Sequence, residues 1–413
     1  MKKNLFDILK ERGYVKDLTH EKEIIDLING DPMTFYLGID PTADSLHIGH
    51  FFALTMFRWL QDFGHRGIIL VGGATALVGD PTGKSDMRKM LSKEEVAHNK
   101  AEVKELVKRF VKTDGDNPAI IVDNADWICD KTYVDFMREI GVHFNVNNML
   151  SAECYKKRLE QGGLTFLEMG YMLMQAFDFV HLNKEFNCKL QIGGSDQWGN
   201  ILAGVDLSRK IGFSEGKKID PLFGFVCPLL LKADGEKMGK TATGTLWVSR
   251  EKTSAFDFFQ AWINSFDEDV ERSLAFFTRM EMEEIKELCN NDIREAKKLL
   301  AFEVTKLVHG EEEAINAKQI AEELFSNKGV SDNMPSTNIS KEKLDINILD
   351  LLVEINLASS KSEARRLVEQ NGISINQIKE NDVNRIINEI DFKDGFIVIQ
   401  KGKKVFLKVI LDN

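Results

Sequence analysis

Apolar residues at the start of the chain alternate between helical spacing and compact runs. Residues 4–12 and 20–29 have helical spacing and predict two short amphipathic helices. The run at 35–39 predicts a strand, and the positions from Ile48 to Leu60 predict a helix that stops at Gly64. A second run, 65–73, predicts a buried parallel strand. Strand, helix and strand in this order form a βαβ unit, so we expect a doubly wound, Rossmann-like parallel α/β sheet.

The pattern changes twice further along the chain. Helical spacing at 93–113 and 131–160 surrounds a short strand run at 119–124, and residues 254–328 are helical and charged without a strand signal. A stretch rich in Ser, Asn, Gly and Pro then precedes a helix at 348–353 and a hairpin that turns at Lys401-Gly402. The expected parts are an α/β domain (1–225), a connecting segment (226–253), an α-helical domain (254–328), a linker (329–343) and a small α+β domain (344–413).

The first strand and its helix are joined by Tyr-Leu-Gly-Ile-Asp-Pro-Thr-Ala-Asp-Ser-Leu-His-Ile-Gly-His, residues 36–50. We expect Asp44 or Ser45 as the helix N-cap. His47 and His50 are three apart and share one face of the first turn. A helix N-terminus with two imidazole donors suits a nucleotide phosphate, and Gly49 lets a flat ligand approach the backbone. One His near a helix start is usually only a surface or capping residue, but the pair after a strand and turn favours a site.

Three more segments carry candidate chemistry. Residues 79–85, Gly-Asp-Pro-Thr-Gly-Lys-Ser, do not form a P-loop, because that motif needs four residues between its glycines and this segment has three. Residues 189–200 run from a strand into a Gly-Gly turn, where a carboxylate at Asp196 could accept ribose hydroxyls. Lys237 and Lys240 lie in a Gly- and Thr-rich loop; lysines in loops are usually only solvated.

A polar stripe marks one predicted helix. Tyr171, Gln175 and Asp178 lie at i, i+4 and i+7, between apolar residues. Such a stripe faces either water or a buried polar ligand. Tyr is a poor choice for a solvated stripe, which favours a site.

These segments together resemble the tyrosyl-tRNA synthetases of bacteria, which belong to the class I aminoacyl-tRNA synthetases. Asp-Pro-Thr-Ala-Asp-Ser-Leu-His-Ile-Gly-His, ending at His50, resembles the first class I signature. Lys-Met-Gly-Lys-Thr, 237–241, resembles the second signature in its KxGKT form, and departs from the KMSKS consensus at Gly239 and Thr241. The string around Glu-Ala-Arg-Arg-Leu-Val-Glu-Gln, 363–370, resembles the S4-type RNA-binding fold.

The resemblance implies a ligase. It would activate L-tyrosine with ATP, giving tyrosyl-adenylate and pyrophosphate, and would then transfer the tyrosyl group to the 3′-terminal ribose of tRNA(Tyr). The implied partners are L-tyrosine, ATP with Mg²⁺, tRNA(Tyr) and a second copy of the chain in a homodimer; no metal site of the protein, DNA or membrane is implied.

The resemblance also assigns residues. The implied catalytic residues are His47, His50, Lys84, Arg88, Lys237, Lys240 and Thr241. The implied tyrosine-binding residues are Tyr36, Asp80, Tyr171, Gln175, Asp178 and Gln197. The implied ATP-binding residues are Gly38, Asp40, Thr42, His47, Gly49, His50, Gly193, Asp196, Lys237 and Lys240. Leu37 and Ala53 stand where some relatives have polar side chains, which we expect to tune ATP affinity.

Charge and cysteine content limit the class of protein. The net charge of −11 excludes a generally basic nucleic-acid coat. Residues 341–413 carry 12 Lys and Arg against 12 Asp and Glu, so this part is neutral while the rest is acidic. We therefore expect any tRNA contact of this part to come from its basic residues, Lys361, Arg365, Arg366, Lys401, Lys403 and Lys404. Five scattered cysteines, no secretory signal and no long apolar run indicate a cytoplasmic protein without a zinc site.

Two alternatives stay open. A tryptophan-specific ligase shares the architecture, but it should not need a phenol-binding pair such as Tyr36 and Asp178. An RNA-binding protein that has lost catalysis should have lost some of His47, His50, Lys237 and Lys240, and all four are present.

Overall fold

The computed structural model describes residues 3–412 apart from 83–89, 162, 215, 217–219, 242–243, 326–334, 377, 393–394 and 403–404. The chain divides into two compact units. The first contains residues 1–253 and 265–300, and the second contains residues 254–264 and 301–413.

A six-stranded sheet forms the centre of the first unit. Its order is β1-β6-β5-β2-β3-β4; β2 to β6 are parallel, and the short β1 pairs antiparallel with β6. The strands are β1 (Asp17–Leu18), β2 (Thr34–Ile39), β3 (Arg66–Val71), β4 (Ile120–Asp123), β5 (Cys188–Gly194) and β6 (Phe223–Cys227). The prediction of a doubly wound α/β sheet is confirmed, and the continuous apolar run 67–71 is buried along its whole length because β3 is an inner strand.

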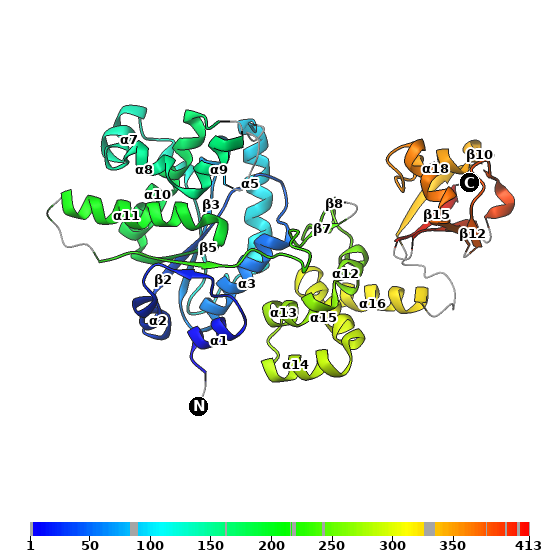
Figure 1. The fold of residues 1–413 in the computed structure, drawn as a ribbon, viewed down its shortest axis with the longest axis horizontal. Helices are drawn as coiled ribbons and strands as arrows, with labels where there is room; N and C mark the ends of the chain where they lie inside the picture. The colour runs from blue at the N-terminus through cyan, green and yellow to red at the C-terminus, as the bar shows by residue number, and fades with distance from the viewer. Residues whose placement is uncertain are drawn as a thin grey trace. The chain divides into compact units, whose positions relative to one another are not determined.

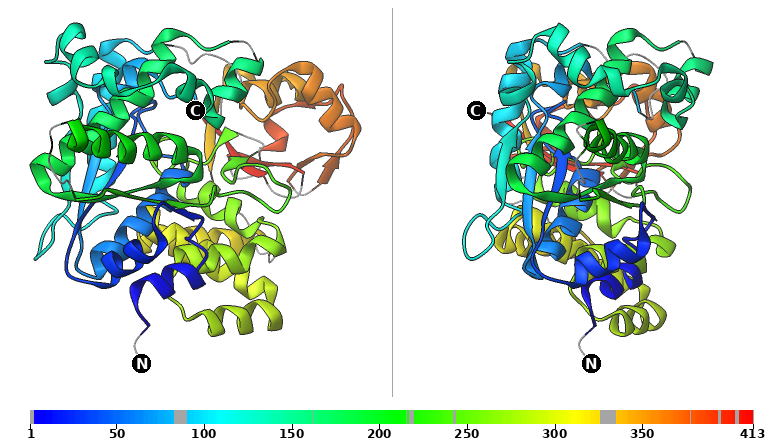
Figure 2. Two further views of the ribbon diagram at one scale, coloured as in Figure 1. Left: turned by 60° about the vertical axis from the view of Figure 1, so that its left-hand side comes forward. Right: turned by 90° about the vertical axis from the view of Figure 1, so that its left-hand side faces the viewer.

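Helices pack on this sheet as crossover connections. Helix α3 contacts β2, β3 and β5, while α10 and α11 pack on each other and on β5, and α11 also on β6 (Figure 1). Figure 2 shows the sheet and its helices from two further sides. The helices of this part are α1 (Leu5–Glu11), α2 (Glu21–Asn29), α3 (Ile48–Asp62), α4 (Thr75–Val78), α5 (Lys93–Lys108), α6 (Ala125–Ile128), α7 (Tyr133–Glu139), α8 (Val146–Leu150), α9 (Glu153–Gln161), α10 (Phe166–Phe186) and α11 (Trp198–Ser214).

Helix α10 is the longest element and carries the predicted polar stripe. Thr165 caps its N-terminus in a capping box with Glu168, and Asn187 ends it in the left-handed conformation, with φ of 51°. The Arg158 guanidinium donates to the buried Glu168 carboxylate at 3.0 Å, which ties α9 to the first turn of α10. Side-chain contacts therefore fix the start of α10, and with it the position of the polar stripe along the helix.

The helical segment 254–328 does not form a compact unit of its own. It contains α12 (Ala255–Ile263), α13 (Asp267–Phe277), α14 (Met282–Asn291), α15 (Ile293–His309) and α16 (Glu311–Phe325). Helices α13 and α14 belong to the first unit, where Arg12 donates to the carbonyls of Ala275 and Thr278 at 2.8 and 2.9 Å. Helices α12 and α16 pack together in the second unit. The expected boundary at 225 also falls inside β6.

The C-terminal part has a five-stranded sheet with two helices, α17 (Ile348–Glu354) and α18 (Lys361–Glu369). The sheet order is β12-β11-β14-β15-β9. Its strands are β9 (Ser336–Ser340), β11 (Ile373–Ile375), β12 (Ile378–Glu380), β14 (Phe396–Lys401) and β15 (Val405–Asp412). The predicted hairpin at Lys401-Gly402 is confirmed by the β14–β15 pairing.

The expected linker is wrong at its C-terminal end. Residues 336–340 form β9, which pairs parallel with β15 and buries Ile339 in the core of this part. Ser, Thr and Asn in this stretch resemble a linker, but an edge strand needs only one inward apolar side chain, and the free edge of β15 supplies its backbone partners. In the described part of the chain, no helix is long and apolar enough to cross a membrane.

Candidate functional site

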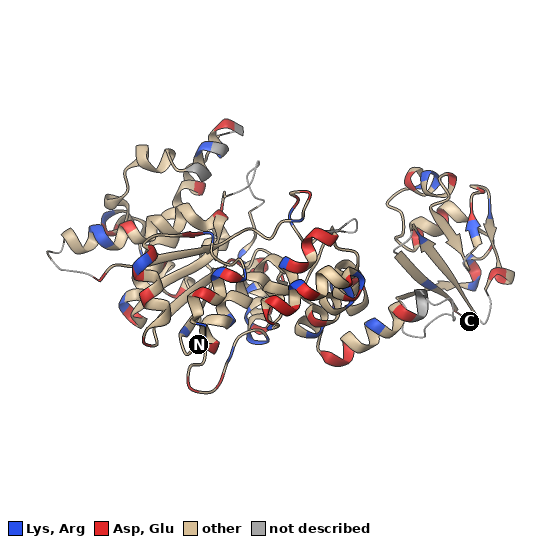
Figure 3. Ribbon diagram, turned by 60° about the horizontal axis from the view of Figure 1, so that its bottom comes forward, with Lys and Arg blue, Asp and Glu red and all other residues tan. Residues whose placement is uncertain are grey.

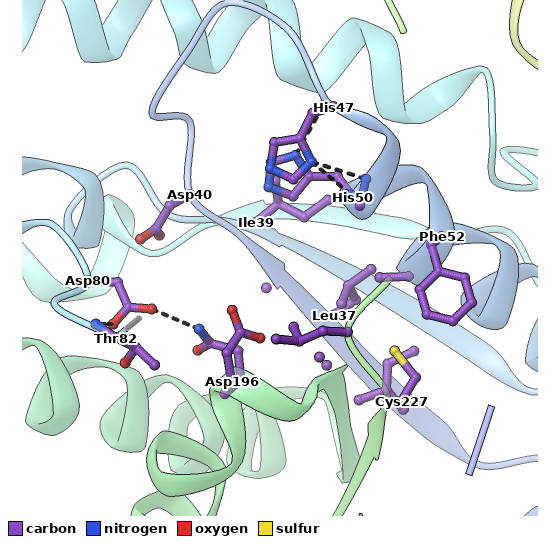
Figure 4. A pocket seen from close by; sticks show the side chains of 18 of the residues that line it. Leu37, Ile39, Asp40, His47, His50, Phe52, Asp80, Thr82, Asp196 and Cys227 are labelled. Atoms are coloured by element: carbon purple, nitrogen blue, oxygen red, sulfur yellow. Dashed lines mark hydrogen bonds between the residues drawn. The ribbon is translucent and has the colours of Figure 1, made fainter. Parts of the chain in front are cut away.

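A pocket of about 480 Å³ opens at the carboxyl ends of β2 and β5. These strands are neighbours in the sheet, but the chain leaves β2 toward β3 and leaves β5 toward β6, on the opposite side. The connections therefore diverge, and a crevice stays open between the two strand ends. Residues from both strands, from the start of α3 and from the loop after β6 line the pocket (Figure 4).

His47 and His50 form a stacked pair over this pocket, with ring centroids 3.8 Å apart and ring planes 10° apart (Figure 4). The Nδ1 atom of His47 accepts the backbone N–H groups of Gly49 and His50 at 3.1 and 3.3 Å. The Nδ1 atom of His50 accepts the backbone N–H of His47 at 3.3 Å. Because Nδ1 is an acceptor in both neutral rings, each ring carries its proton on Nε2, which makes both Nε2 atoms donors at a helix N-terminus.

The predicted N-cap at Asp44 or Ser45 is wrong. Helix α3 begins at Ile48, His47 is its N-cap, and the two imidazoles form the capping box. Asp44 instead forms an ion pair with Lys252 at 2.7 Å, and this contact lowers the pKa of its carboxyl. The Ser45 hydroxyl accepts the backbone N–H of Ser249. The prediction relied on the usual capping residue types, and it did not consider that an imidazole pair can cap a helix.

Two carboxylates and their hydrogen-bond partners form one wall of the pocket. Asp40 accepts the Thr75 hydroxyl at 2.7 Å and the Tyr171 hydroxyl at 2.8 Å. Asp80 accepts the side-chain amide of Gln197 at 2.7 Å, which Figure 4 shows as a dashed line. Two neighbouring carboxylates, of which Asp80 is buried and Asp40 partly buried, would attract a cationic group such as an ammonium.

Amide side chains connect this wall to the polar stripe of α10. Gln175 donates to the Gln197 side-chain oxygen at 3.2 Å. The side-chain oxygen of Gln175 is buried and accepts no hydrogen bond among the described groups. The stripe therefore faces the pocket, which confirms the interpretation of Tyr171, Gln175 and Asp178 as a buried polar face.

Tyr36 and Asp178 lie at the deep end of the pocket, and both are fully buried. The Tyr36 hydroxyl makes no hydrogen bond within the described part of the chain. Asp178 accepts the side-chain amide of Asn124 at 3.0 Å and the indole N–H of Trp127 at 2.8 Å. Burial raises the pKa of Asp178 to about 8, although the two hydrogen bonds oppose the shift.

Sequence reasoning missed Asn124 and Trp127, which lie directly after β4. Asn124 also donates to the Thr75 hydroxyl at 3.0 Å, and its oxygen accepts the backbone N–H of Ala74 at 2.8 Å. The signal that could have found both is their place at the carboxyl end of a parallel strand, where ligand-contacting residues gather.

Asp196 and Lys237 face the pocket from its other side. Burial raises the pKa of Asp196; the charge of Asp80 raises it further and the charge of Lys237 lowers it. The backbone of Lys237 pairs with Leu231 at the base of the loop. Four residues that were predicted to bind ATP also line the pocket: Gly38, Thr42, Gly49 and Gly193.

The loop that carries Lys237 rests on the first turn of α3. Gly239 has a φ of +92°, and a Cβ atom added there would lie 2.4 Å from Cγ2 of Ile48. The Gly239 carbonyl accepts the Leu246 N–H at 2.6 Å, and the Leu246 carbonyl accepts the Ile48 N–H at 3.2 Å. A glycine is therefore required where the loop meets the helix that carries both imidazoles.

Some predicted residues cannot be placed. Lys84, Arg88, Lys403 and Lys404 lie outside the described residues. For Lys240 and Thr241 the structure describes a short backbone strand, β7, and no side-chain position.

The basic residues expected at the C-terminal part are largely paired. Lys361 forms an ion pair with Asp350, and Arg365 with Glu369 at 3.8 Å. Lys401 donates to the Leu357 carbonyl at 2.8 Å and to Glu363 at 3.1 Å, so it also ties α18 to the sheet. Basic and acidic positions are interspersed in this part (Figure 3). Among the described residues, no group of three or more His, Cys, Asp or Glu side chains could hold a metal ion.

Comparisons with known proteins agree along the whole chain. The family model "tRNA synthetases class I (W and Y)" matches residues 29–326, and the model "Tyrosine--tRNA ligase SYY-like C-terminal domain" matches residues 326–409. The chain is 51% identical over 415 residues to the tyrosine–tRNA ligase of Clostridium tetani, covering 100% of both chains.

Solved structures resemble the fold with less sequence identity. The C-terminally truncated mitochondrial tyrosyl-tRNA synthetase of Aspergillus nidulans matches with a TM-score of 0.70 and 30% identity, covering 78% of this chain and 95% of that one. A tryptophanyl-tRNA synthetase from Encephalitozoon cuniculi matches with a TM-score of 0.54 and 13% identity, covering 78% and 91%. The fold by itself therefore does not separate the two amino-acid specificities.

The raised pKa of Asp178 predicts how an Asp178→Asn variant differs in stability from the wild type. The folded chain keeps this proton up to about pH 8, whereas the unfolded chain loses it near pH 4. The folded state thus binds more protons between these values, and this group's stabilisation is lost as the pH rises through the window. Asn cannot ionise, so the variant should gain stability relative to the wild type as pH increases, until about pH 8.

Urea unfolding of both proteins across this range measures the difference. A difference that stays constant with pH would show that Asp178 is already ionised in the folded chain.

Proposed function

Because the chain belongs to the class I tRNA synthetases of the tryptophan and tyrosine group, and because its full-length relative at 51% identity is a tyrosine–tRNA ligase, we infer that it is a tyrosine–tRNA ligase. It joins tyrosine to the adenylyl group of ATP with release of pyrophosphate, and then passes the tyrosyl group to tRNA with release of AMP. Within this group, one observation supports tyrosine as the substrate. The buried Tyr36 hydroxyl has no hydrogen bond among the described residues, and it lies in the same pocket as the buried Asp178 carboxyl.

The deep end of the pocket is proposed to hold the substrate phenol. A phenol can donate to a carboxyl oxygen of Asp178 and accept from the Tyr36 hydroxyl. Phenylalanine would leave the buried Tyr36 hydroxyl unpaired, at a cost of about 1–3 kcal/mol, and would offer no donor to Asp178, which keeps only its bonds from Asn124 and Trp127. This explains rejection of phenylalanine without an editing step; the tyrosyl enzyme is the standard example of such discrimination.

The carboxylate wall is proposed to bind the amino acid's ammonium group. Asp80 and the Tyr171 hydroxyl flank the position between the phenol end and the stacked imidazoles. The unpaired oxygen of Gln175 supplies a further acceptor. Gln197, which already touches Asp80, is proposed to reach the reacting carboxylate.

ATP is proposed to occupy the mouth of the pocket. The Nε2 donors of His47 and His50, with the helix N-terminus, face the phosphates. A Cβ atom at Gly49 would lie 3.0 Å from the His47 ring, so only glycine leaves the imidazole in place. Asp196 accepts ribose hydroxyls. The remaining nucleotide contacts are proposed from Gly38, Asp40, Thr42, Gly193, Lys237, Lys240 and Thr241, with Lys84 and Arg88 near the phosphates.

The chemistry requires positioning and charge stabilisation. The tyrosine carboxylate attacks the α-phosphorus of ATP, the adenylate forms, and pyrophosphate leaves; Mg²⁺ is proposed to arrive with the ATP phosphates. Charge develops on the departing pyrophosphate, where the His and Lys donors act. The tRNA 3′-terminal ribose hydroxyl then attacks the activated carboxyl and releases AMP. No step needs a covalent bond to the protein.

The C-terminal part is proposed to bind tRNA. Residues 344–413, with β9, form the RNA-binding part, the helical segment 254–328 serves the anticodon side, and the first unit carries out catalysis. Lys361, Arg365, Arg366, Lys403 and Lys404 are the proposed phosphate contacts. Lys401 is the least suitable of the set, because it is held by Glu363 and a backbone carbonyl.

We propose a cytoplasmic location, since the four described cysteines assigned as free have no disulfide partner and tRNA charging occurs there.

A homodimer is also proposed. Large apolar side chains are exposed along one stretch of the chain, on or beside α7, α8, α9 and the start of α10, helices that Figure 1 labels. They are Tyr133, Val134, Val142, Val146, Leu159, Phe166 and Leu167. Phe166 is 71% exposed, and such a patch commonly marks a protein interface.

Tyrosine-dependent ATP–pyrophosphate exchange tests the proposed function, and Tyr36→Phe tests the pocket. The variant should lower kcat/KM for tyrosine about fivefold, because one hydrogen bond worth about 1 kcal/mol is lost. The ratio of kcat/KM for tyrosine to kcat/KM for phenylalanine should become smaller. Tyr14→Phe is the matched control, since Tyr14 is equally buried but bonds Thr55 and Phe276 outside the pocket.

An unchanged tyrosine-to-phenylalanine ratio in the Tyr36→Phe variant would place the phenol elsewhere. Absence of tyrosine-dependent exchange in the wild type would overturn the function itself.

Gly239→Ala tests the contact between the loop and α3. The new methyl group meets Ile48 and the φ of +92° becomes strained, so exchange should fall about five- to a hundredfold, from a cost of about 1–3 kcal/mol. Gly235→Ala is the control: its φ is +84°, but nothing lies within 4 Å of the added Cβ. Equal losses in the two variants would mean that backbone strain alone, and not the seat on Ile48, is responsible.

Phe166→Asp tests the dimer. A charge placed in an apolar interface is left unpaired, so the variant should become a monomer at concentrations where the wild type is a dimer. Sedimentation velocity measures both, with Phe213→Asp as the control because Phe213 is 90% exposed on another helix, α11. A monomeric wild type would exclude the proposal.

A further inference from the structure

We propose that His181 is a positioning residue for amino-acid recognition, because its imidazole stacks on Trp127 and holds the indole N–H on Asp178. The inference rests on the proposed function, since it takes Asp178 as the group that binds the phenol.

The two donors to Asp178 are held in different ways. Asn124 is fully buried and fixed by its own hydrogen bonds to Thr75 and Ala74. Trp127 has a single polar atom, Nε1, and this atom is already used on Asp178 at 2.8 Å. The indole must therefore be oriented by packing alone.

The backbone under Trp127 offers little support. The residue belongs to α6, a four-residue helix in which no residue is fully buried and whose N-cap residue, Asn124, makes no side-chain capping bond to the helix. Exposed Cys129 follows it directly. The indole is partly buried and packs against apolar residues of two core clusters, so its orientation depends on these neighbours and on a ring stacked against it.

His181 supplies that ring. The imidazole and indole centroids are 4.2 Å apart and their planes differ by 18°, a stacked geometry. His181 lies three residues after Asp178 on α10, so both side chains lie on one face of the helix. The same helix thus carries the carboxylate and the ring that orients its donor.

A second ring also contacts the imidazole. Phe177 packs against it in a tilted arrangement, with centroids 6.2 Å apart, and Lys131 lies 5.3 Å over the Phe177 ring. Burial lowers the pKa of His181; the charge of Glu185 opposes this, and the charges of Lys184 and Lys131 add to it. The imidazole is therefore neutral near pH 7.5, and brings no cation close to the carboxyl that binds the phenol.

The test compares two replacements of similar size in the full-length chain. His181→Phe keeps a flat ring, and His181→Leu keeps apolar contact and helix propensity without a flat ring. ATP–pyrophosphate exchange at pH 7.5 gives kcat and KM for tyrosine and for phenylalanine. His181→Leu should raise the tyrosine KM about two- to tenfold, leave kcat and the ATP KM near the wild-type values, and narrow the tyrosine-to-phenylalanine ratio. His181→Phe should retain the wild-type ratio.

A double-mutant cycle shows whether the effect passes through the indole. Trp127→Phe removes the indole N–H that His181 is proposed to position. In this background, His181→Leu should cause no further change in the tyrosine-to-phenylalanine ratio of kcat/KM. Lys184→Ala is the control for disturbance of α10, because this exposed side chain lies one turn further along the helix.

Three outcomes overturn the inference: a wild-type ratio in His181→Leu, an equal loss in His181→Phe, or full additivity with Trp127→Phe. Each of these requires an active wild type. A wild type without tyrosine-dependent exchange overturns the proposed function instead, so the two failures are distinguishable.

Discussion

The pocket depends on the order of the strands in the sheet, because the sheet is extended in opposite directions from β2 and from β5. Both strands are parallel and adjacent, yet the chain continues from them toward opposite edges of the sheet. No connection covers their carboxyl ends, so backbone amides and short polar side chains stay accessible there. The stacked imidazoles, the carboxylate wall and the phenol end all depend on this opening, because each is attached to a strand end or to the helix that follows it.

The pocket keeps polar groups buried and unsatisfied. The Tyr36 hydroxyl and the side-chain oxygens of Gln175 and Gln191 accept or donate nothing among the described groups. An unpaired buried group of this kind costs about 1–3 kcal/mol. The surrounding core tolerates this cost because β2, β3 and β5 are buried on both faces. A polar ligand that pairs these groups recovers the cost on binding, which favours a polar ligand over an apolar analogue of the same shape.

The two signature segments are mechanically connected. The backbone of residues 246–248 pairs with residues 46–48, and Leu246 also bonds the Gly239 carbonyl. Backbone hydrogen bonds therefore connect the lysine-bearing loop to the turn that carries His47 and His50. The consensus serine at this position of the loop would clash with Ile48, which gives a physical reason for glycine in this chain.

The sequence alone determined most of the elements and the parallel α/β sheet, because hydrophobic periodicity and glycine turns are local signals; the resemblance to the synthetases supplied most of the candidate site residues. Tyr171, Gln175 and Asp178 could be placed on one face from spacing, without knowledge of their partners. Tertiary structure decided what local signals do not contain. His47 replaced Asp44 or Ser45 as the helix cap because Lys252 and Ser249 engage those side chains. Residues 336–340 became a strand because β15 presents a free edge. Asn124, Trp127 and His181 gather around Asp178 only after β4 and α10 are packed together, since contacts between residues more than fifty positions apart leave no periodic trace in the chain.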